Sequence, residues 1–251
     1  MRPRALEDVF KKNHDIDVVV HLAYADMPQE NSKSEFLHET NVFGTMRLLN
    51  LCRKYGIKKF IHKSPSSIYG ANPDNPVLIK EDYPLRGNRN YQLIRDKIEA
   101  DIFCQLYMKE NDLPKIVILR FCGIIGNHIR SPLNTIFKDK FVPMIAGYDP
   151  MFQIMDERDV IDAITLCVLN ENIQGIFNIA GKKIQHLSEV IQRLGKIIMP
   201  IPEFLIDLVY KPLFKMNQEH SFPFDINYWK YPFVIDTTKA REILKFEPKY
   251  L

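Results

Sequence analysis

The chain has 251 residues, of which 46% are hydrophobic and 26% charged, and its formal net charge is +3. This length suits one large domain or two small ones with a substantial core. A charge so near neutrality, without a basic stripe, argues against a nucleic-acid-binding protein. Four lysines are interpreted as solvated charges at a helix end and on a strand: Lys54, Lys58, Lys59 and Lys63.

The cysteines and the apolar stretches indicate a cytoplasmic protein. The four cysteines are far apart in apolar segments, with spacing that fits neither a disulfide framework nor a zinc site, so we expect reduced core thiols and no metal. Met1 leads into a charged helical pattern and not into a signal peptide. Prolines and charges interrupt the apolar stretch 196–215, which therefore predicts an amphipathic helix and no transmembrane segment.

The first half of the chain alternates between helical and strand patterns. In order we expect a helix at 5–12, a buried strand at 18–23, a long helix at 39–55 that ends at Gly56, a strand at 59–62, a long helix at 91–111 and a strand at 116–120. This alternation predicts an α/β fold with a parallel sheet and right-handed crossovers.

The second half has a different texture. It predicts a short helix at 134–144, a turn and strand at 147–155, a helix capped by Asp159, and a strand at 175–179. From residue 187 onward the pattern is helical and rich in proline and aromatics, with a last helix beginning near Asp236.

The stretch 59–101 carries the candidate chemistry. The strand at 59–62 runs into Ser64, Pro65 and Ser66, and the next long helix begins at Tyr91 and carries Lys97. Open α/β sheets bind ligands beyond the carboxyl ends of their strands. Hydroxyls at a strand end, facing a helix start with Tyr and Lys, therefore predict an active site here.

Several motifs occur in a characteristic order. They are His21-Leu22-Ala23, Asn41-Val42 with Gly44-Thr45, Ser66-Ser67-Ile68-Tyr69-Gly70, Arg95-Asp96-Lys97, Leu119-Arg120, Asn178-Ile179-Ala180-Gly181 and Asp236-Thr237-Thr238. Together they resemble the extended short-chain dehydrogenase/reductase family, the NAD-dependent epimerase/dehydratases that include UDP-glucose 4-epimerase. The run 147–153, with Arg95-Asp96-Lys97, resembles a bacterial subgroup of sugar epimerases.

The resemblance implies a Rossmann-type doubly wound parallel sheet, N-terminally truncated, with a smaller C-terminal substrate-binding lobe. Residues 1–126 would form a partial NAD(P)-binding domain. Residues 127–251 would form mainly the lobe, with strands and helices returning to the sheet around 151–181. The implied function is hydride transfer with NAD or NADP on a small molecule such as a nucleotide sugar. The two long helices would form a homodimer interface.

The resemblance also assigns residues. Tyr91, Lys97 and Ser66 would be catalytic. The cofactor would contact Leu22, Ala23, Asn41, Ser64 and Lys97. For Asn41 the alternative is a satisfied buried amide, and for the serines it is a role in a turn.

One departure from the family is an absence. None of the 10 glycines belongs to the glycine-rich turn that would hold a pyrophosphate. Two βαβ units, on the order of 60 residues, precede the matching part of the family pattern. We therefore expect a fragment or a truncated gene product, in which the strand at 18–22 would be an uncovered hydrophobic edge.

Two further departures concern catalysis. Leu93 stands at the family's tyrosine position, four residues before Lys97, and Pro65 stands at its serine position. Tyr91 lies six residues before Lys97, about 120° from it around a helix, or it pairs with Arg95. The alternatives to an active enzyme are a catalytically impaired dinucleotide-binding sensor or scaffold and a non-functional fragment.

Overall fold

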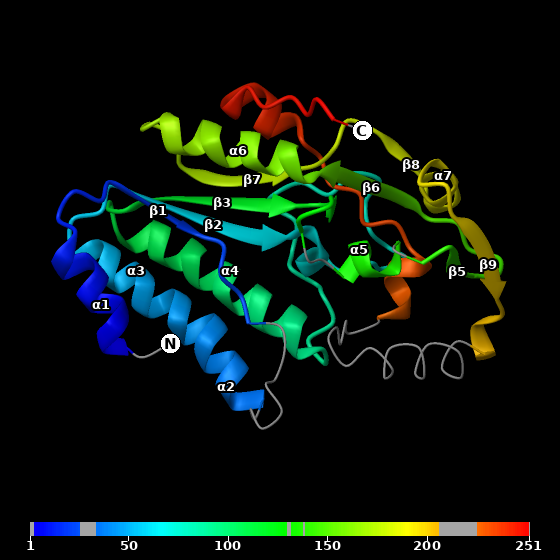
Figure 1. The fold of residues 1–251 in the computed structure, drawn as a ribbon, viewed down its shortest axis with the longest axis horizontal. Coiled ribbons are helices and arrows are strands. Elements are labelled where there is room, and N and C mark those ends of the chain that lie inside the picture. Colours follow the sequence, from blue (N-terminus) through cyan, green and yellow to red (C-terminus); the bar gives the residue numbers. More distant parts are fainter. Residues whose placement is uncertain (1–2, 26–33, 130–131, 138, 206–224, 251) are drawn as a thin grey trace.

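A computed structural model describes residues 3–25, 34–129, 132–137, 139–205 and 225–250. A four-stranded parallel sheet forms its centre, in the order β1–β2–β3–β7 (Figure 1). The strands are β1 (Val18–His21), β2 (Lys59–Pro65), β3 (Lys115–Phe121) and β7 (Gly175–Ile179). All four strands were predicted, and β2 continues three residues past its predicted end. The parallel α/β sheet is therefore confirmed.

Helices cover both faces of this sheet (Figure 1). On one face lie α1 (Pro3–Lys12), α2 (Ser34–His38), the π-helical turn η1 (Glu39–Phe43), α3 (Gly44–Lys54) and α4 (Gln92–Glu110). On the other lie α6 (Glu157–Leu169) and η5 (Ala240–Leu244). The predicted helix at 39–55 corresponds to η1 and α3 together. Helices on both faces of a parallel sheet make the doubly wound arrangement that the sequence predicted.

The strand residues alternate between two cores. On β2, Ile61 packs in the cluster beneath α6, whereas its neighbour Phe60 packs in the cluster with α3 and α4. A strand that buries both faces must be apolar on both, which explains the continuous hydrophobic runs. Among the described residues β1 pairs with β2 alone, so its other edge faces no strand there.

A second, smaller group of elements lies beyond the carboxyl ends of the central strands. It contains β4 (Gly123–Ile125), α5 (Pro132–Ile136), β5 (Phe141–Ile145), β6 (Met151–Asp156), β8 (Ile184–His186), α7 (Leu187–Arg193), β9 (Ile197–Ile201), η3 (Glu203–Leu205) and η4 (Ile226–Trp229). The strands form two small sheets, β4–β6–β8 and β5–β9. This group has its own core, which includes Val142, Leu187 and Ile191.

Two predictions about this second part were wrong. The predicted helix at 134–144 is split into α5 and β5, because Phe141–Ile145 pairs in parallel with Ile197–Ile201. The cap of α6 is Asp156, whose carboxylate accepts from the Arg158 N–H. Asp159 is buried and instead accepts from the backbone N–H groups of Lys249 and Tyr250.

The amphipathic helix predicted for 196–215 can be checked only in its first part, where Glu203–Leu205 form the 3₁₀ helix η3. Residues 197–201 form β9, and 206–215 lie outside the described residues. No helix in the described part of the chain is long and apolar enough to cross a membrane.

Two of the lysines interpreted as solvated are not. Lys59 is only 3% exposed, and its ammonium donates to the carbonyl oxygens of Cys167 and Asn170. Lys63 is half-buried. Lys59 lies between β1 and β3, whereas Lys63 lies past the end of β1 and pairs with β3 alone. The four cysteines are buried and unpaired, as expected.

Candidate active site

The carboxyl end of β2 turns sharply into the site. Pro65 ends the strand, and residues 66–69 form the 3₁₀ turn η2 (Ser66–Tyr69). Gly70 follows with φ +77°, and a Cβ there would lie 2.7 Å from the Arg86 carbonyl oxygen, so only glycine fits. The sequence Ser-Pro-Ser-Ser therefore sits at the carboxyl edge of the sheet, as predicted.

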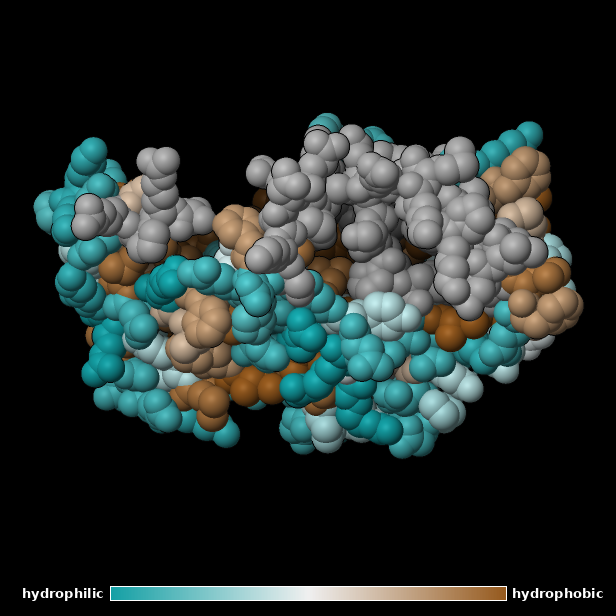
Figure 2. Space-filling view, turned by 90° about the horizontal axis from the view of Figure 1, so that it is seen from below, coloured by the Kyte–Doolittle hydropathy of each residue, from teal (hydrophilic) through white to brown (hydrophobic). Residues whose placement is uncertain are grey.

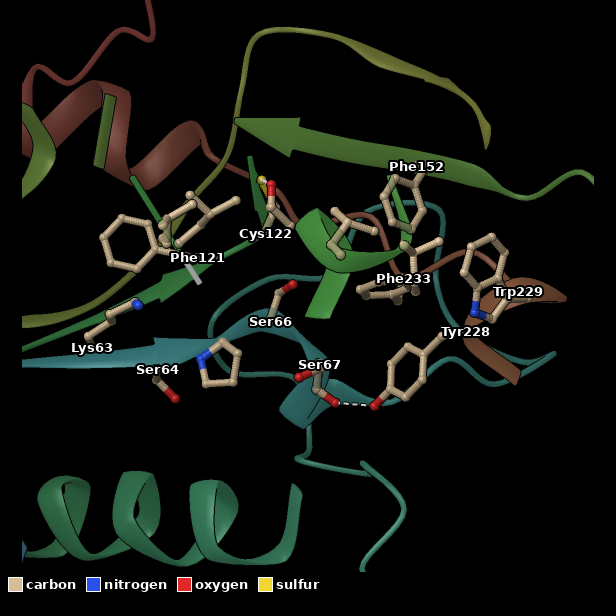
Figure 3. A pocket seen from close by; sticks show the side chains of 16 residues that line it. Lys63, Ser64, Ser66, Ser67, Phe121, Cys122, Phe152, Tyr228, Trp229 and Phe233 are labelled. Atoms are coloured by element: carbon tan, nitrogen blue, oxygen red, sulfur yellow. Dashed lines mark hydrogen bonds between the residues drawn. The ribbon is translucent and has the colours of Figure 1, made fainter. Parts of the chain in front are cut away.

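A cavity of about 240 Å³, here called the β2–β3 pocket, opens at this edge (Figure 3). Segments of the central sheet and of the second part of the chain line it together: Lys63, Ser64, Pro65, Ser66, Ser67, Phe121, Cys122, Gly123, Ile124, Ile129, Leu133, Ile136, Phe152, Tyr228, Trp229 and Phe233. Most of these side chains are apolar or aromatic. The pocket thus combines an apolar wall with polar groups from the end of β2.

Tyr228 ties the two sides of the pocket together. Its hydroxyl donates to the Ser67 carbonyl oxygen, across 161 residues of sequence (Figure 3). Burial, with lesser contributions from Asp225 and Tyr91, raises the pKa of Tyr228 well above its ordinary value. The phenol therefore stays protonated at neutral pH and acts as a hydrogen-bond donor.

Of the predicted catalytic residues, Ser66 lines this pocket. Tyr91 is the cap residue of α4 and packs beside Ile68, Ile94 and Ile98. It is not among the lining residues, although it lies close enough to Tyr228 to raise that pKa. Its ring is half-buried at the start of this helix, and its catalytic role stays a prediction.

Lys97 has a different neighbour from the one that the family pattern suggests. Its ammonium lies 3.5 Å from the centre of the Tyr24 ring, a cation–π contact. The Tyr24 hydroxyl donates in turn to the carbonyl oxygen of Leu93, 3.1 Å away. Tyr24, in the loop after β1, is thus the aromatic residue against Lys97, and sequence reasoning missed it.

The residues predicted to bind the cofactor lie around the ends of β1 and β2. Leu22 is exposed, and Ala23 lines a second cavity of about 460 Å³ together with Tyr24 and Asn41. Ser64 is fully buried and points towards α4, away from Ser66 (Figure 3). The residues therefore surround one end of the sheet without converging on a single cavity.

Asn41 serves the fold directly. Its side chain accepts from the Ala25 N–H at 2.8 Å and donates to the Ala25 carbonyl oxygen at 2.9 Å. It also donates to the buried carboxylate of Asp96. This pattern matches the alternative of a satisfied buried amide, which fixes the loop after β1 against α4.

The Asn41→Ala substitution is expected to lower the free energy of unfolding by about 1–3 kcal/mol, because it leaves the Ala25 backbone groups unsatisfied. Urea unfolding followed by circular dichroism measures the change. Asn13→Ala is the matched control, since Asn13 is exposed and donates to Val9. Equal losses in the two variants would contradict the assigned role.

A dinucleotide fits these residues only in part. A lysine ammonium, serine hydroxyls and a small alanine suit a ribose and a nicotinamide. The described residues contain no glycine-rich turn leading into a helix N-terminus, the arrangement that holds a pyrophosphate. No chemical step at the cofactor follows from these residues alone. In the same described part, no group of three His, Cys, Asp or Glu side chains could hold a metal.

Comparison with known proteins identifies a family. The model of the NAD dependent epimerase/dehydratase family matches residues 1–180. An uncharacterized protein of Mycobacterium tuberculosis (strain ATCC 25618 / H37Rv) is 29% identical over 245 residues, covering 95% of this chain and 64% of the relative. The chain thus spans less than two thirds of that protein's length.

Solved structures share the fold. A dTDP-glucose 4,6-dehydratase from Bacillus anthracis, in complex with NAD, has a TM-score of 0.73 at 21% identity, over 99% of this chain and 72% of that one. A UDP-N-acetylglucosamine 4-epimerase from Bacillus cereus has a TM-score of 0.70 at 19% identity, over 98% of this chain and 78% of that one. The Rossmann-type fold and the family resemblance are confirmed.

Proposed function

The chain belongs to the NAD-dependent epimerase/dehydratase family, and from this premise we propose that it acts on a small hydroxyl-bearing molecule bound in the β2–β3 pocket. The reaction would be an NAD(P)-linked oxidation or reduction at a carbinol carbon, as part of an epimerase, dehydratase or reductase activity. Nucleotide sugars, on which the named relatives act, are the first substrates to test. The observation that carries this proposal is the buried Ser66 in that pocket.

Ser66 suits the role of a substrate-positioning group. Its side chain is 2% exposed and enters the cavity from the turn after β2 (Figure 3). A hydroxyl there can donate to a substrate oxygen or accept from it. It would take the part that the family's serine plays at the neighbouring position, where this chain has Pro65. NAD or NADP, when bound, would supply the hydride acceptor.

Ser66→Ala is expected to lower kcat/KM by about tenfold or more, the effect of removing one hydrogen bond at the reacting group. Nicotinamide absorbance, with UDP-glucose or dTDP-glucose as substrate, follows the reaction. Ser67→Ala is the control, because the Ser67 carbonyl that Tyr228 contacts remains. Absence of both turnover and NAD(P) binding in the wild-type chain would contradict the proposal.

Tyr91 and Lys97 remain the proposed catalytic pair. Tyr91 would exchange the proton of the substrate hydroxyl, and Lys97 would lower the pKa of that phenol or contact the ribose of the cofactor. A Tyr91→Phe variant that loses turnover but keeps substrate affinity would support this assignment. Unchanged kinetics would remove Tyr91 from the mechanism.

A second candidate is a protein that holds a dinucleotide without turning over a substrate. The contact between the Lys97 ammonium and the Tyr24 ring favours it, since a cation–π contact stabilises the charge of this lysine without a part in catalysis. Calorimetric binding of NADH by wild-type protein, lost in Lys97→Met, together with no turnover on any substrate, would select this candidate.

The remaining family expectations are proposals as well. Residues 127–251 would supply most of the substrate lobe, and the buried free cysteines suit a cytoplasmic location. A homodimer would use the helical face of α3 and α4, where hydrophobic patches lie among hydrophilic ones (Figure 2). Leu106 is half-exposed on α4, and so is Phe43 at the end of η1, just before α3.

A further inference from the structure

We propose that the β2–β3 pocket takes a substrate with an apolar ring or chain that carries one anionic oxygen group, and that Lys63 binds this group. The inference rests on the proposed function in one respect, the placing of the substrate in this pocket. It narrows the class of hydroxyl-bearing substrates and assigns a residue that the family motifs do not include.

The apolar part of the argument is the aromatic wall. Phe152 and Phe233 pack edge to face, with ring centroids 5.8 Å apart and planes at 85°. Tyr228 and Phe233 do the same at 5.0 Å and 80°. Edge-to-face pairs of this kind are favourable and hold each ring in place. The wall is therefore a fixed apolar surface, suited to an apolar ring or chain of the ligand.

The polar part of the argument is the position of Lys63. Side chains on a strand alternate between its faces, so Lys63 points to the side opposite Ser64. Figure 3 shows its amine on the same side of β2 as Ser66 and below Phe121. It is the charged residue among the described side chains that line the pocket.

Lys63 differs from the neighbouring lysines in having no partner. Lys58 pairs with Asp17 at 2.9 Å, and the buried Lys59 donates to two backbone carbonyl oxygens. Within the described chain Lys63 makes neither a hydrogen bond nor an ion pair. Burial lowers the pKa of its amine, because water is partly removed from the ammonium. An unpaired, partly dehydrated cation is costly, and an anionic group of a ligand offsets that cost.

The number of charges in the lining favours a ligand with one anionic group over the nucleotide sugars named above as the first substrates to test, so a nucleotide sugar bound in this pocket would count against this inference. A pyrophosphate carries at least two charges and is usually met by several donors, often arginine. The described lining offers one lysine beside serine hydroxyls and aromatic rings. A single carboxylate-type group next to Lys63, with the apolar body against Phe152 and Phe233, matches this lining better.

The test uses the one tryptophan of the chain, Trp229, which lines the pocket. Calorimetry gives the Kd of 2-naphthoate and of its neutral counterpart 2-naphthalenemethanol, and the Trp229 emission reports that each ligand occupies this cavity. Wild-type protein is expected to bind the naphthoate at least about tenfold more tightly than the alcohol, the effect of one charge-assisted hydrogen bond. Neither measurement needs the cofactor or turnover.

Substitutions of Lys63 assign the effect. Lys63→Met is expected to remove the preference for naphthoate. The Kd of the alcohol is expected to stay within about twofold of the wild-type value. Lys63→Gln, which keeps a polar side chain, is the second variant in case Lys63→Met does not fold. It is also expected to lose the preference for naphthoate. Lys58→Met, which changes an exposed ion-paired lysine, is the control and is expected to keep the preference for naphthoate.

The inference would be overturned by equal affinity of wild-type protein for the two probes, by no change of Trp229 emission on binding, or by a naphthoate preference that survives both Lys63 substitutions. Tight UDP-glucose binding that changes Trp229 emission and does not depend on Lys63 would also overturn it. Loss of NAD(P) binding or of turnover, with the Lys63-dependent preference intact, would instead contradict the proposed function alone.

Discussion

Replacing Asp101 with alanine is expected to lower the free energy of unfolding by about 3–5 kcal/mol, the largest effect of any single substitution considered for this chain. Asp101 and Arg120 form a buried pair, exposed by 0% and 1%. Arg120 donates through Nε and Nη2 to the two carboxylate oxygens, at 3.0 and 2.7 Å. Removing the carboxylate leaves a guanidinium charge that cannot be lost by deprotonation and that has no counter-ion.

The pair also holds the active-site turn. Arg120 donates to the Tyr69 hydroxyl at 2.7 Å, and Tyr69 donates to the side-chain oxygen of Asn178 at 2.8 Å. These contacts join α4, β3, the turn η2 and β7 in one network. Because the turn η2 begins at Ser66, disturbance of this network is expected to reach the β2–β3 pocket.

Urea unfolding of Asp101→Ala, Arg120→Met and the double variant measures the effect. Each single variant is expected to lose several kcal/mol, and the double variant less than the sum, since it leaves no unpaired charge. Asp74→Ala is the control, because Asp74 pairs with Arg86 on the surface, where solvent screens the charges and the pair contributes little to stability. A loss in Asp101→Ala as small as the control's would contradict the role of the pair.

The two lysines of β2 mark a limit of sequence reasoning. The strand itself was predictable from the apolar run around Phe60 and Ile61. That its side chains alternate between the two faces of the sheet follows from the two-residue period of a strand. The surroundings of Lys59 and Lys63 were not, because they depend on carbonyl oxygens and aromatic rings more than 50 residues away. A lysine in a strand pattern is normally solvated, and only tertiary packing decides otherwise.

The candidate site was predictable in the same uneven way. The motif order located the end of β2 and therefore Ser66, because the turn is local in sequence. It did not locate Tyr228 and Trp229, which come from a segment without a recognisable pattern and reach the pocket through the fold. The partner of Lys97 was missed because spacing along α4 pointed to Leu93 and Tyr91, whereas the ring against it comes from the loop after β1.

Acid is expected to destabilise the chain strongly between pH 6.5 and 4, through the buried His62 and the partly buried His21. His62 is 3% exposed, and neither ring nitrogen has a hydrogen-bond partner. The centre of its ring lies 5.6 Å from that of His21, whose Nε2 is 2.9 Å from the Thr45 hydroxyl. Burial first, then the charge of His21, lowers the pKa of His62 to about 3. Burial, then the charge of Lys97, lowers the pKa of His21 to about 4.

The direction of the effect follows from proton binding. Unfolding restores both pKa values to about 6.5, so below that pH the unfolded chain binds protons that the folded chain excludes. The free energy of unfolding therefore falls as pH falls from 6.5 towards 4, by about 2 kcal/mol per histidine at pH 5. Burial alone would raise the pKa of Asp101, but the charge of Arg120 and its hydrogen bonds outweigh burial and lower this pKa. The Asp101 carboxylate therefore loses its contribution to the free energy of unfolding only at still lower pH.

His62→Phe separates the two contributions. It is expected to raise the stability at pH 7 by about 1 kcal/mol, because two unsatisfied ring nitrogens disappear, and to remove about half of the acid loss between pH 7 and 5. Urea unfolding at pH 7, 6 and 5 measures the slope, and His14→Asn, at an exposed position, is the control. If His62→Phe kept the full acid loss, protonation of other groups would have to cause it.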